Sequence, residues 1–211
     1  MQKKLLDFAA GLGLNVSEQT LAQLTQYADL VWQKKDMLNL TSVSDKEEMI
    51  TRHICDGLIA AAFVAKKSQE KPDFSVADMG SGAGYIGLTI AIVWPQIKVS
   101  LVESLERRCA FLNWACIKLG LKNVTVRNIR LGQQTVGPFE VVTERAMGKI
   151  NDILPLIEPA VKAGGYFIAY QSCPKEAEST ILEQLNMQEQ PVIAYRLPDE
   201  NKERYLAVFT K

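Results

Sequence analysis

Apolar residues recur at helical spacing through the first third of the chain. Ser17 is placed to cap a helix that ends near Asp36, and its apolar positions fall on one face, namely Leu21, Leu24, Ala28 and Val31. Residues 39–42 are predicted to form a turn. Either Ser44 or Asp45 is predicted to cap a second helix that runs to about Lys67.

A polar segment that ends in proline, residues 68–72, is expected to be a linker. It separates a helical extension, residues 1–70, from one compact core, residues 71–211, in which short apolar runs alternate with helical stretches. Strands are expected at 74–78, 97–103, 124–127, 139–143 and 165–170, and a closing antiparallel pair at 192–196 and 205–209. Helices are expected up to about residue 93 and at 105–120, 150–161 and 176–185. This alternation is typical of an α/β fold with a doubly wound, mostly parallel, Rossmann-like sheet.

Composition narrows the functional classes. The chain has 211 residues, of which 47% are hydrophobic and 23% charged, as in an ordinary globular protein. Its 24 basic and 24 acidic residues cancel, so any contact with nucleic acid must use a local patch. Six basic residues between positions 103 and 130 either contact phosphates or form solvated helix faces: Arg107, Arg108, Lys118, Lys122, Arg127 and Arg130.

Cysteine and histidine usage argues against a metal site. The four cysteines form no Cys-x-x-Cys pair and the chain has one histidine, so we expect reduced, packed thiols and no bound metal. The N-terminus has no sustained apolar run, and no stretch reaches the roughly 18 apolar residues of a membrane helix. We therefore expect a cytoplasmic monomer with no membrane partner.

The strongest chemical signal is a glycine-rich loop after the first predicted strand, Asp78-Met79-Gly80-Ser81-Gly82-Ala83-Gly84. Ligands of parallel sheets bind beyond the carboxyl ends of the strands, where glycines allow close approach. Residues 82–87 match the dinucleotide pattern G-x-G-x-x-G, but the Asp78 carboxylate would repel a pyrophosphate. It suits the sulfonium and ammonium groups of S-adenosylmethionine, and Glu103 can accept hydrogen bonds from the ribose of either ligand. Alternatively, both acids are helix caps or surface residues.

Further motifs surround this loop, namely Asn39-Leu40-Thr41-Ser42, Arg52-His53-x-x-Asp56, Glu103-Ser104, Arg107-Arg108-x-x-Phe111-Leu112 and Arg145-Ala146. With them the chain resembles the bacterial glucose-inhibited division protein B family over nearly its whole length. The resemblance implies a class I methyltransferase fold with an N-terminal helical extension. It also implies S-adenosylmethionine as cofactor and methylation of guanine N7 in small-subunit (16S) ribosomal RNA, as RNA or as a ribosomal particle.

The resemblance also implies site residues. Beside Asp78, Gly82 and Glu103, it places cofactor contacts at Gly80, Tyr85, Leu131, Gly132 and Arg145. It places Asn39, Arg52 and His53 near the site mouth, and the candidates for catalysis are Asn39, His53 and Arg145. The chain departs from the family pattern at Ile86, at Gly132, at Gln171-Ser172 and, conservatively, at Glu103.

Each catalytic candidate also has a structural interpretation. Guanine N7 carries a lone pair, so its methylation needs positioning rather than a strong base. Arg145 could instead form a salt bridge with Glu144 or Glu103, His53 could be a structural hydrogen-bonding residue, and Asn39 a turn residue. The alternative functions are a methyltransferase of another substrate, an NAD-type oxidoreductase, and a noncatalytic, ribosome-associated RNA-binding factor.

Overall fold

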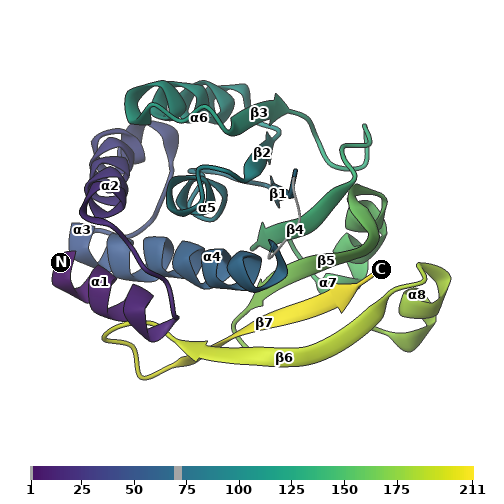
Figure 1. Cartoon of the computed structure of the whole chain (residues 1–211). Coiled ribbons are helices and arrows are strands. Elements are labelled where there is room, and N and C mark those ends of the chain that lie inside the picture. Colours follow the sequence, from purple (N-terminus) through teal and green to yellow (C-terminus); the bar gives the residue numbers. More distant parts are fainter. Residues whose placement is uncertain (1, 69–72) are drawn as a thin grey trace.

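Seven strands form one sheet at the centre of the molecule (Figure 1). The computed structural model describes residues 2–68 and 73–211. The strands are β1 Ser75–Met79, β2 Lys98–Glu103, β3 Val124–Asn128, β4 Phe139–Arg145, β5 Val161–Gln171, β6 Gln188–Arg196 and β7 Glu203–Thr210. Their order is β3-β2-β1-β4-β5-β7-β6. The first five are parallel, and β7 pairs antiparallel with both β5 and β6, which confirms the predicted sheet and its closing pair.

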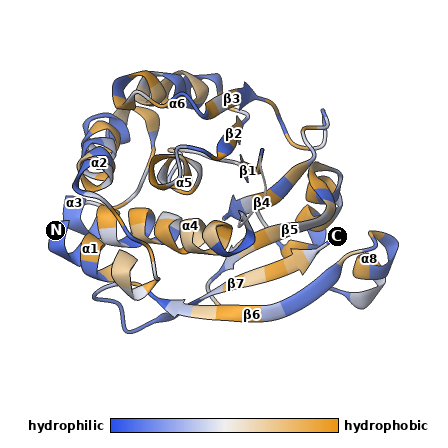
Figure 2. Cartoon of the chain, viewed as in Figure 1, coloured by the Kyte–Doolittle hydropathy of each residue, from blue (hydrophilic) through white to orange (hydrophobic). Residues whose placement is uncertain are grey.

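Alternate residues of the strands enter two apolar cores, one on each face of the sheet. Val76 packs in the core that includes residues of helices α4 (Cys55–Ser68), α5 (Gly87–Val93) and α6 (Glu106–Leu119). The next residue, Ala77, packs in the core that includes residues of α7 (Ile150–Ile157). This follows from the two-residue period of a strand. Figure 2 shows α4 hydrophobic along most of its length, as its buried run Cys55–Val64 requires.

The N-terminal helices follow the predicted pattern. Ser17 caps α2 (Glu18–Leu38) by accepting a hydrogen bond from the Thr20 N–H at 3.1 Å, and the predicted apolar face is buried. Asp45, one of the two predicted caps, begins α3 (Lys46–Met49). Two elements were not predicted: a separate helix, α1 (Gln2–Gly11), and a π-helical stretch, Ile50–Ile54, which joins α3 to α4. Apolar spacing does not distinguish such a widened turn from an α-helix.

Several predicted boundaries in the second half of the chain are wrong. The helix expected at 150–161 ends at Ile157, and a 3₁₀ turn, Glu158–Ala160, leads directly into β5. That turn contains Pro159, which has no N–H for an α-helical hydrogen bond. The strand therefore begins at Val161, before its predicted start at residue 165. The helix expected at 176–185 is the short α8, Ser179–Gln184.

The predicted linker lies mostly outside the described residues. Ser68 is the last residue of α4, and residues 69–72 fall between the two described ranges. The boundary placed at residues 70 and 71 stays a prediction. Among the helices described, none has the length and apolarity to cross a membrane. Apolar residues from Leu5 to Val208 share the core on the α4 face, which α1 and α2 join by packing on α4, α5 and α6.

Candidate active site

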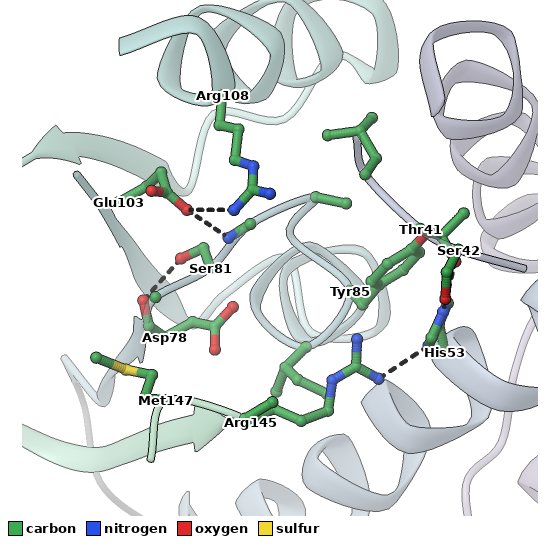
Figure 3. Close-up of a pocket in the computed structure, with 16 residues that line it drawn as sticks. Thr41, Ser42, His53, Asp78, Ser81, Tyr85, Glu103, Arg108, Arg145 and Met147 are labelled. Atoms are coloured by element: carbon green, nitrogen blue, oxygen red, sulfur yellow. Dashed lines mark hydrogen bonds and ion pairs between the residues drawn. The ribbon is translucent and has the colours of Figure 1, made fainter. Parts of the chain in front are cut away.

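A cavity of about 440 Å³ lies at the carboxyl ends of β1, β2 and β4, the edge at which ligands of parallel sheets bind (Figure 3). Segments from the N-terminal helices, the glycine loop, and the ends of β2 and β4 all reach it. Its lining is Leu40, Thr41, Ser42, His53, Asp78, Gly80, Ser81, Gly82, Ala83, Tyr85, Ile86, Glu103, Arg108, Arg145, Ala146 and Met147. Most of the predicted site residues therefore meet in one place.

The glycine loop exposes its backbone to this cavity. Gly80 and Gly82 have φ angles of 67° and 58°, in the left-handed region that favours glycine. A Cβ on Gly80 would lie 2.8 Å from the sulfur of Met147, so no larger residue fits there without a shift. From α2, the buried Tyr27 hydroxyl donates a hydrogen bond to the Ala83 carbonyl at 2.9 Å. The loop is thus open toward the cavity, and the hydrogen bond from Tyr27 anchors it to α2.

The Asp78 carboxylate is buried in the cavity wall, with both oxygens hydrogen-bonded. Oδ1 accepts from the Thr143 hydroxyl at 2.8 Å, and Oδ2 accepts from the N–H of Gly87 at 3.1 Å. Burial raises the pKa of Asp78 to about 6, against the opposing effect of these hydrogen bonds. Gly87 is the first residue of α5, so this hydrogen bond caps the start of that helix. Helix capping was the alternative role considered for Asp78 in the sequence.

Glu103 ties the end of β2 to the glycine loop. Its Oε2 accepts a hydrogen bond from the Gly82 N–H at 2.9 Å. Its Oε1 accepts from the N–H groups of Ser104 at 2.8 Å and Leu105 at 2.9 Å. The guanidinium of Arg108 lies 3.9 Å from Oε2. A carboxylate offers about four acceptor positions, so this buried group keeps acceptor capacity for a ligand in the cavity.

His53 is a neutral, doubly hydrogen-bonded ring between the helices and the sheet. Arg145 lies 3.1 Å from Nδ1, and because a guanidinium only donates, Nδ1 is the acceptor. The ring proton is therefore on Nε2, which donates to the Thr41 hydroxyl at 3.0 Å. Burial and the nearby charge of Arg145 lower the pKa of His53 to about 3. The ring also packs on Tyr85, with centroids 4.2 Å apart, and Arg145 lies 5.2 Å from the Tyr85 centroid.

Asp56 anchors Arg145 from the opposite side. Its carboxylate is 1% exposed and accepts hydrogen bonds from Arg145 at 3.0 Å, Arg204 at 3.4 Å and the Tyr195 hydroxyl at 2.8 Å. Its backbone carbonyl accepts from the Tyr170 hydroxyl at 2.7 Å. The salt bridge considered for Arg145 does exist, but its partner is Asp56 and not the predicted Glu144 or Glu103. Asp56 joins α4 to the ends of β4 and β5 and to the β6–β7 hairpin.

Four predicted site residues do not line the cavity. Arg52 forms ion pairs with Glu48 and Glu200, both at 3.2 Å, and lines a different cavity. Asn39 is exposed and ends α2 in a left-handed conformation, with φ of 48°, as the alternative of a turn residue expected. Leu131 and Gly132 line a second cavity of about 250 Å³, together with Leu156 of α7. The Leu131 side chain packs on the α7 core, which draws its loop to that face of the sheet. Their predicted contacts with the cofactor stay predictions.

Sequence reasoning missed four residues with clear roles in this arrangement: Thr41, Asp56, Arg108 and Met147. Thr41, Asp56 and Arg108 belong to motifs noted in the sequence, so a signal existed without an assigned role. Arg108 also donates to the Asn39 carbonyl at 3.1 Å, which links α6 to the turn after α2. Met147 had no sequence signal. The expectation of packed thiols is wrong for Cys173, which is exposed.

The described residues contain no group of three or more His, Cys, Asp or Glu side chains arranged to hold a metal ion.

The family model described as rRNA small subunit methyltransferase G matches residues 20–205 of the chain. Ribosomal RNA small subunit methyltransferase G of Limosilactobacillus reuteri is 33% identical over 209 residues, covering 94% of this chain and 86% of that protein. The protein of the same name from Acetivibrio thermocellus is 29% identical, covering 100% and 88% respectively.

Solved structures support the fold. A precorrin-6y C5,15-methyltransferase from Geobacter metallireducens superposes with a TM-score of 0.54 at 14% identity, covering 72% of this chain and 87% of that one. A SAM dependent methyltransferase from Aquifex aeolicus gives 0.53 at 17% identity, covering 72% and 89%. These likenesses agree with a class I methyltransferase sheet.

Proposed function

The chain belongs to the rRNA small subunit methyltransferase G family, and from this premise we propose that its 440 Å³ cavity is the site of methyl transfer to guanine N7 of small-subunit ribosomal RNA. The cofactor of this reaction is S-adenosylmethionine, which supplies an electrophilic methyl group on a cationic sulfur. The observation that carries the proposal is the convergence of the glycine loop, Glu103 and Arg145 on one cavity.

The residues around the cavity suit this cofactor. Gly80 and Gly82 offer a backbone surface without side chains, and a Cβ on Gly80 would collide with Met147. Glu103 lies at the end of β2, where the one acceptor position left on its carboxylate suits a ribose hydroxyl. The Asp78 carboxylate lines the same cavity, so its negative charge favours a cationic ligand over a pyrophosphate.

The proposed chemistry moves no proton. S-adenosylmethionine, held by the glycine loop and Glu103, would supply the methyl group, and the N7 lone pair would accept it without the help of a base. His53 agrees with this, because one ring nitrogen accepts from Arg145 and the other donates to Thr41. We assign His53 and Tyr85 to holding Arg145 at the cavity wall, and Arg145 to orienting the acceptor.

The proposal extends to partners and location. We propose that the protein acts as a monomer in the cytoplasm on ribosomal RNA or a ribosomal particle, without a metal ion. An acceptor without a proton to lose requires no metal-activated base. Gel filtration at several protein concentrations tests the monomer, and retained activity after prolonged chelation tests the absence of a metal requirement.

Methyl transfer is tested with labelled S-adenosylmethionine and small ribosomal subunits or their RNA, followed by mapping of the methylated base. We expect N7-methylguanine with the parent protein, and a loss of about 100-fold or more in rate for Arg145→Ala, in line with losing an orienting contact. Lys98→Gln is the control, since Lys98 begins β2 at the opposite edge of the sheet. Donor binding without N7-methylguanine on any RNA form would favour a noncatalytic factor, and normal activity in Arg145→Ala would remove the assigned role.

A further inference from the structure

A second polar cavity, of about 350 Å³, adjoins the first. Arg145 and Ala146 line both, so the two cavities are separated only by the end of β4. The other walls come from the carboxyl end of β5 and from the β6–β7 hairpin. A group bound here would lie directly beside the methyl-transfer site.

The charges that face this cavity favour an anion. The Asp56 carboxylate is covered, because Tyr195 donates to Oδ1 while Arg145 and Arg204 donate to Oδ2. Arg204 is itself paired with Glu200, through contacts of 2.8 and 2.9 Å, so Glu200 largely neutralises its positive charge. The net charge that remains open to a ligand is therefore positive.

Two cations keep donors to offer. Arg145 uses only one terminal nitrogen on His53 and Asp56, and its other nitrogens bond to no atom of the described residues. Lys202 is exposed at the hairpin and has no ion-pair partner in residues 2–68 and 73–211. The exposed Ser172 hydroxyl, after β5, adds a neutral donor. Guanidinium, ammonium and hydroxyl donors around one space suit phosphate oxygens.

We propose that this second cavity binds a backbone phosphate of the RNA, adjacent to the target guanine. The assignment rests on the proposed function, because a phosphodiester is the anionic group that an RNA necessarily carries beside the base being methylated. In this arrangement Arg145 contacts the target guanine and also the adjacent phosphate of the RNA backbone. The two contacts together fix the base relative to the donor methyl group.

The test measures RNA affinity against salt concentration for three variants and the parent. Lys202→Gln removes one cation from the cavity, Ser172→Lys adds one without breaking a hydrogen bond of the structure, and Lys98→Gln is the control at the opposite sheet edge. Thermal unfolding and calorimetry with S-adenosylmethionine check that each variant folds and binds the donor as the parent does.

We expect Lys202→Gln to weaken RNA binding by up to about fivefold at 0.1 M salt, the effect of one partly exposed ion pair. The slope of log affinity against log salt should become shallower by roughly 0.7 to 0.9 for Lys202→Gln and steeper by a similar amount for Ser172→Lys. Lys98→Gln should match the parent.

Unchanged slopes in both cavity variants, with a parent that methylates RNA, would overturn the phosphate site and leave the proposed function standing. A parent that neither binds nor methylates small-subunit RNA would overturn both. Inorganic phosphate provides the remaining comparison: if it binds the parent more tightly than Lys202→Gln while RNA affinity is the same in both, the cavity is a site for a free anion and the RNA assignment fails.

Discussion

The neutral state of His53 can be tested by replacing it with glutamine. Glutamine has an amide oxygen that can accept from Arg145 and an amide nitrogen that can donate to Thr41, but it does not titrate. Because His53 is the only histidine in the chain, the pH dependence that distinguishes the parent from His53→Gln belongs to this one ring.

The magnitude follows from the two pKa values. In the unfolded chain the ring has its ordinary pKa of 6.5, and in the folded protein burial and Arg145 lower the pKa to about 3. As the pH falls below 6.5 the unfolded chain takes up the proton first, so the stabilisation is complete above pH 6.5 and is lost progressively toward pH 3. Between pH 8 and pH 5 the loss amounts to about 2 kcal/mol.

Urea unfolding of both proteins at pH 8, 7, 6 and 5 measures this difference. Burial raises the pKa of Asp78 to about 6 and that of Glu144 to about 7, and both have the opposite pH dependence, since their stability contribution rises as pH falls. Both carboxyl groups are present in the parent and in the variant. Subtracting one curve of unfolding free energy against pH from the other therefore leaves the contribution of the His53 imidazole. Parallel curves for the two proteins, or a single histidine NMR signal that titrates near pH 6.5, would refute the assignment.

Three further substitutions test the packing and the ligand contacts. Gly87→Ala should destabilise the protein by roughly 1 to 3 kcal/mol, because a Cβ would lie 2.2 Å from Leu101 Cδ2; an unchanged urea midpoint would contradict this. Asp56→Asn should lower the free energy of unfolding by roughly 3 kcal/mol or more, since it leaves Arg145 without its buried counter-charge, and a loss near zero speaks against the network. Glu103→Gln should weaken donor binding about tenfold in calorimetry, and equal affinity would exclude a ribose contact.

The sheet and the centre of the site were predictable because they depend on local signals. Short apolar runs predicted β1 and β2, and the parallel order then brings Asp78 and Glu103, each at or near a carboxyl end, to one edge. The glycine loop follows from the same rule. Ser17 marked a helix start because capping chemistry is local, and it acts as the cap in the structure.

The remainder depends on contacts between distant segments. Asp56 meets Tyr195 and Arg204 from positions 139 and 148 residues away, and no spacing in the sequence encodes that meeting. The positions of Leu131 and Gly132 depend on how their loop packs against α7. The predicted partner of Arg145 was wrong for the same reason. The acids considered were its chain neighbour Glu144 and Glu103 at the same sheet edge, whereas the acid that reaches it comes from the N-terminal helices.

The Asp56 network also bears on the order in which the site can be completed during synthesis. Asp56 and His53 are synthesised before Arg145, and Tyr195 and Arg204 are synthesised after it. A nascent chain that stops before the β6–β7 hairpin has the glycine loop and Glu103, yet it lacks two of the three side chains that donate to the Asp56 carboxylate. Arg145 is therefore fully anchored only after the β6–β7 hairpin has been synthesised and has folded against the ends of β4 and β5.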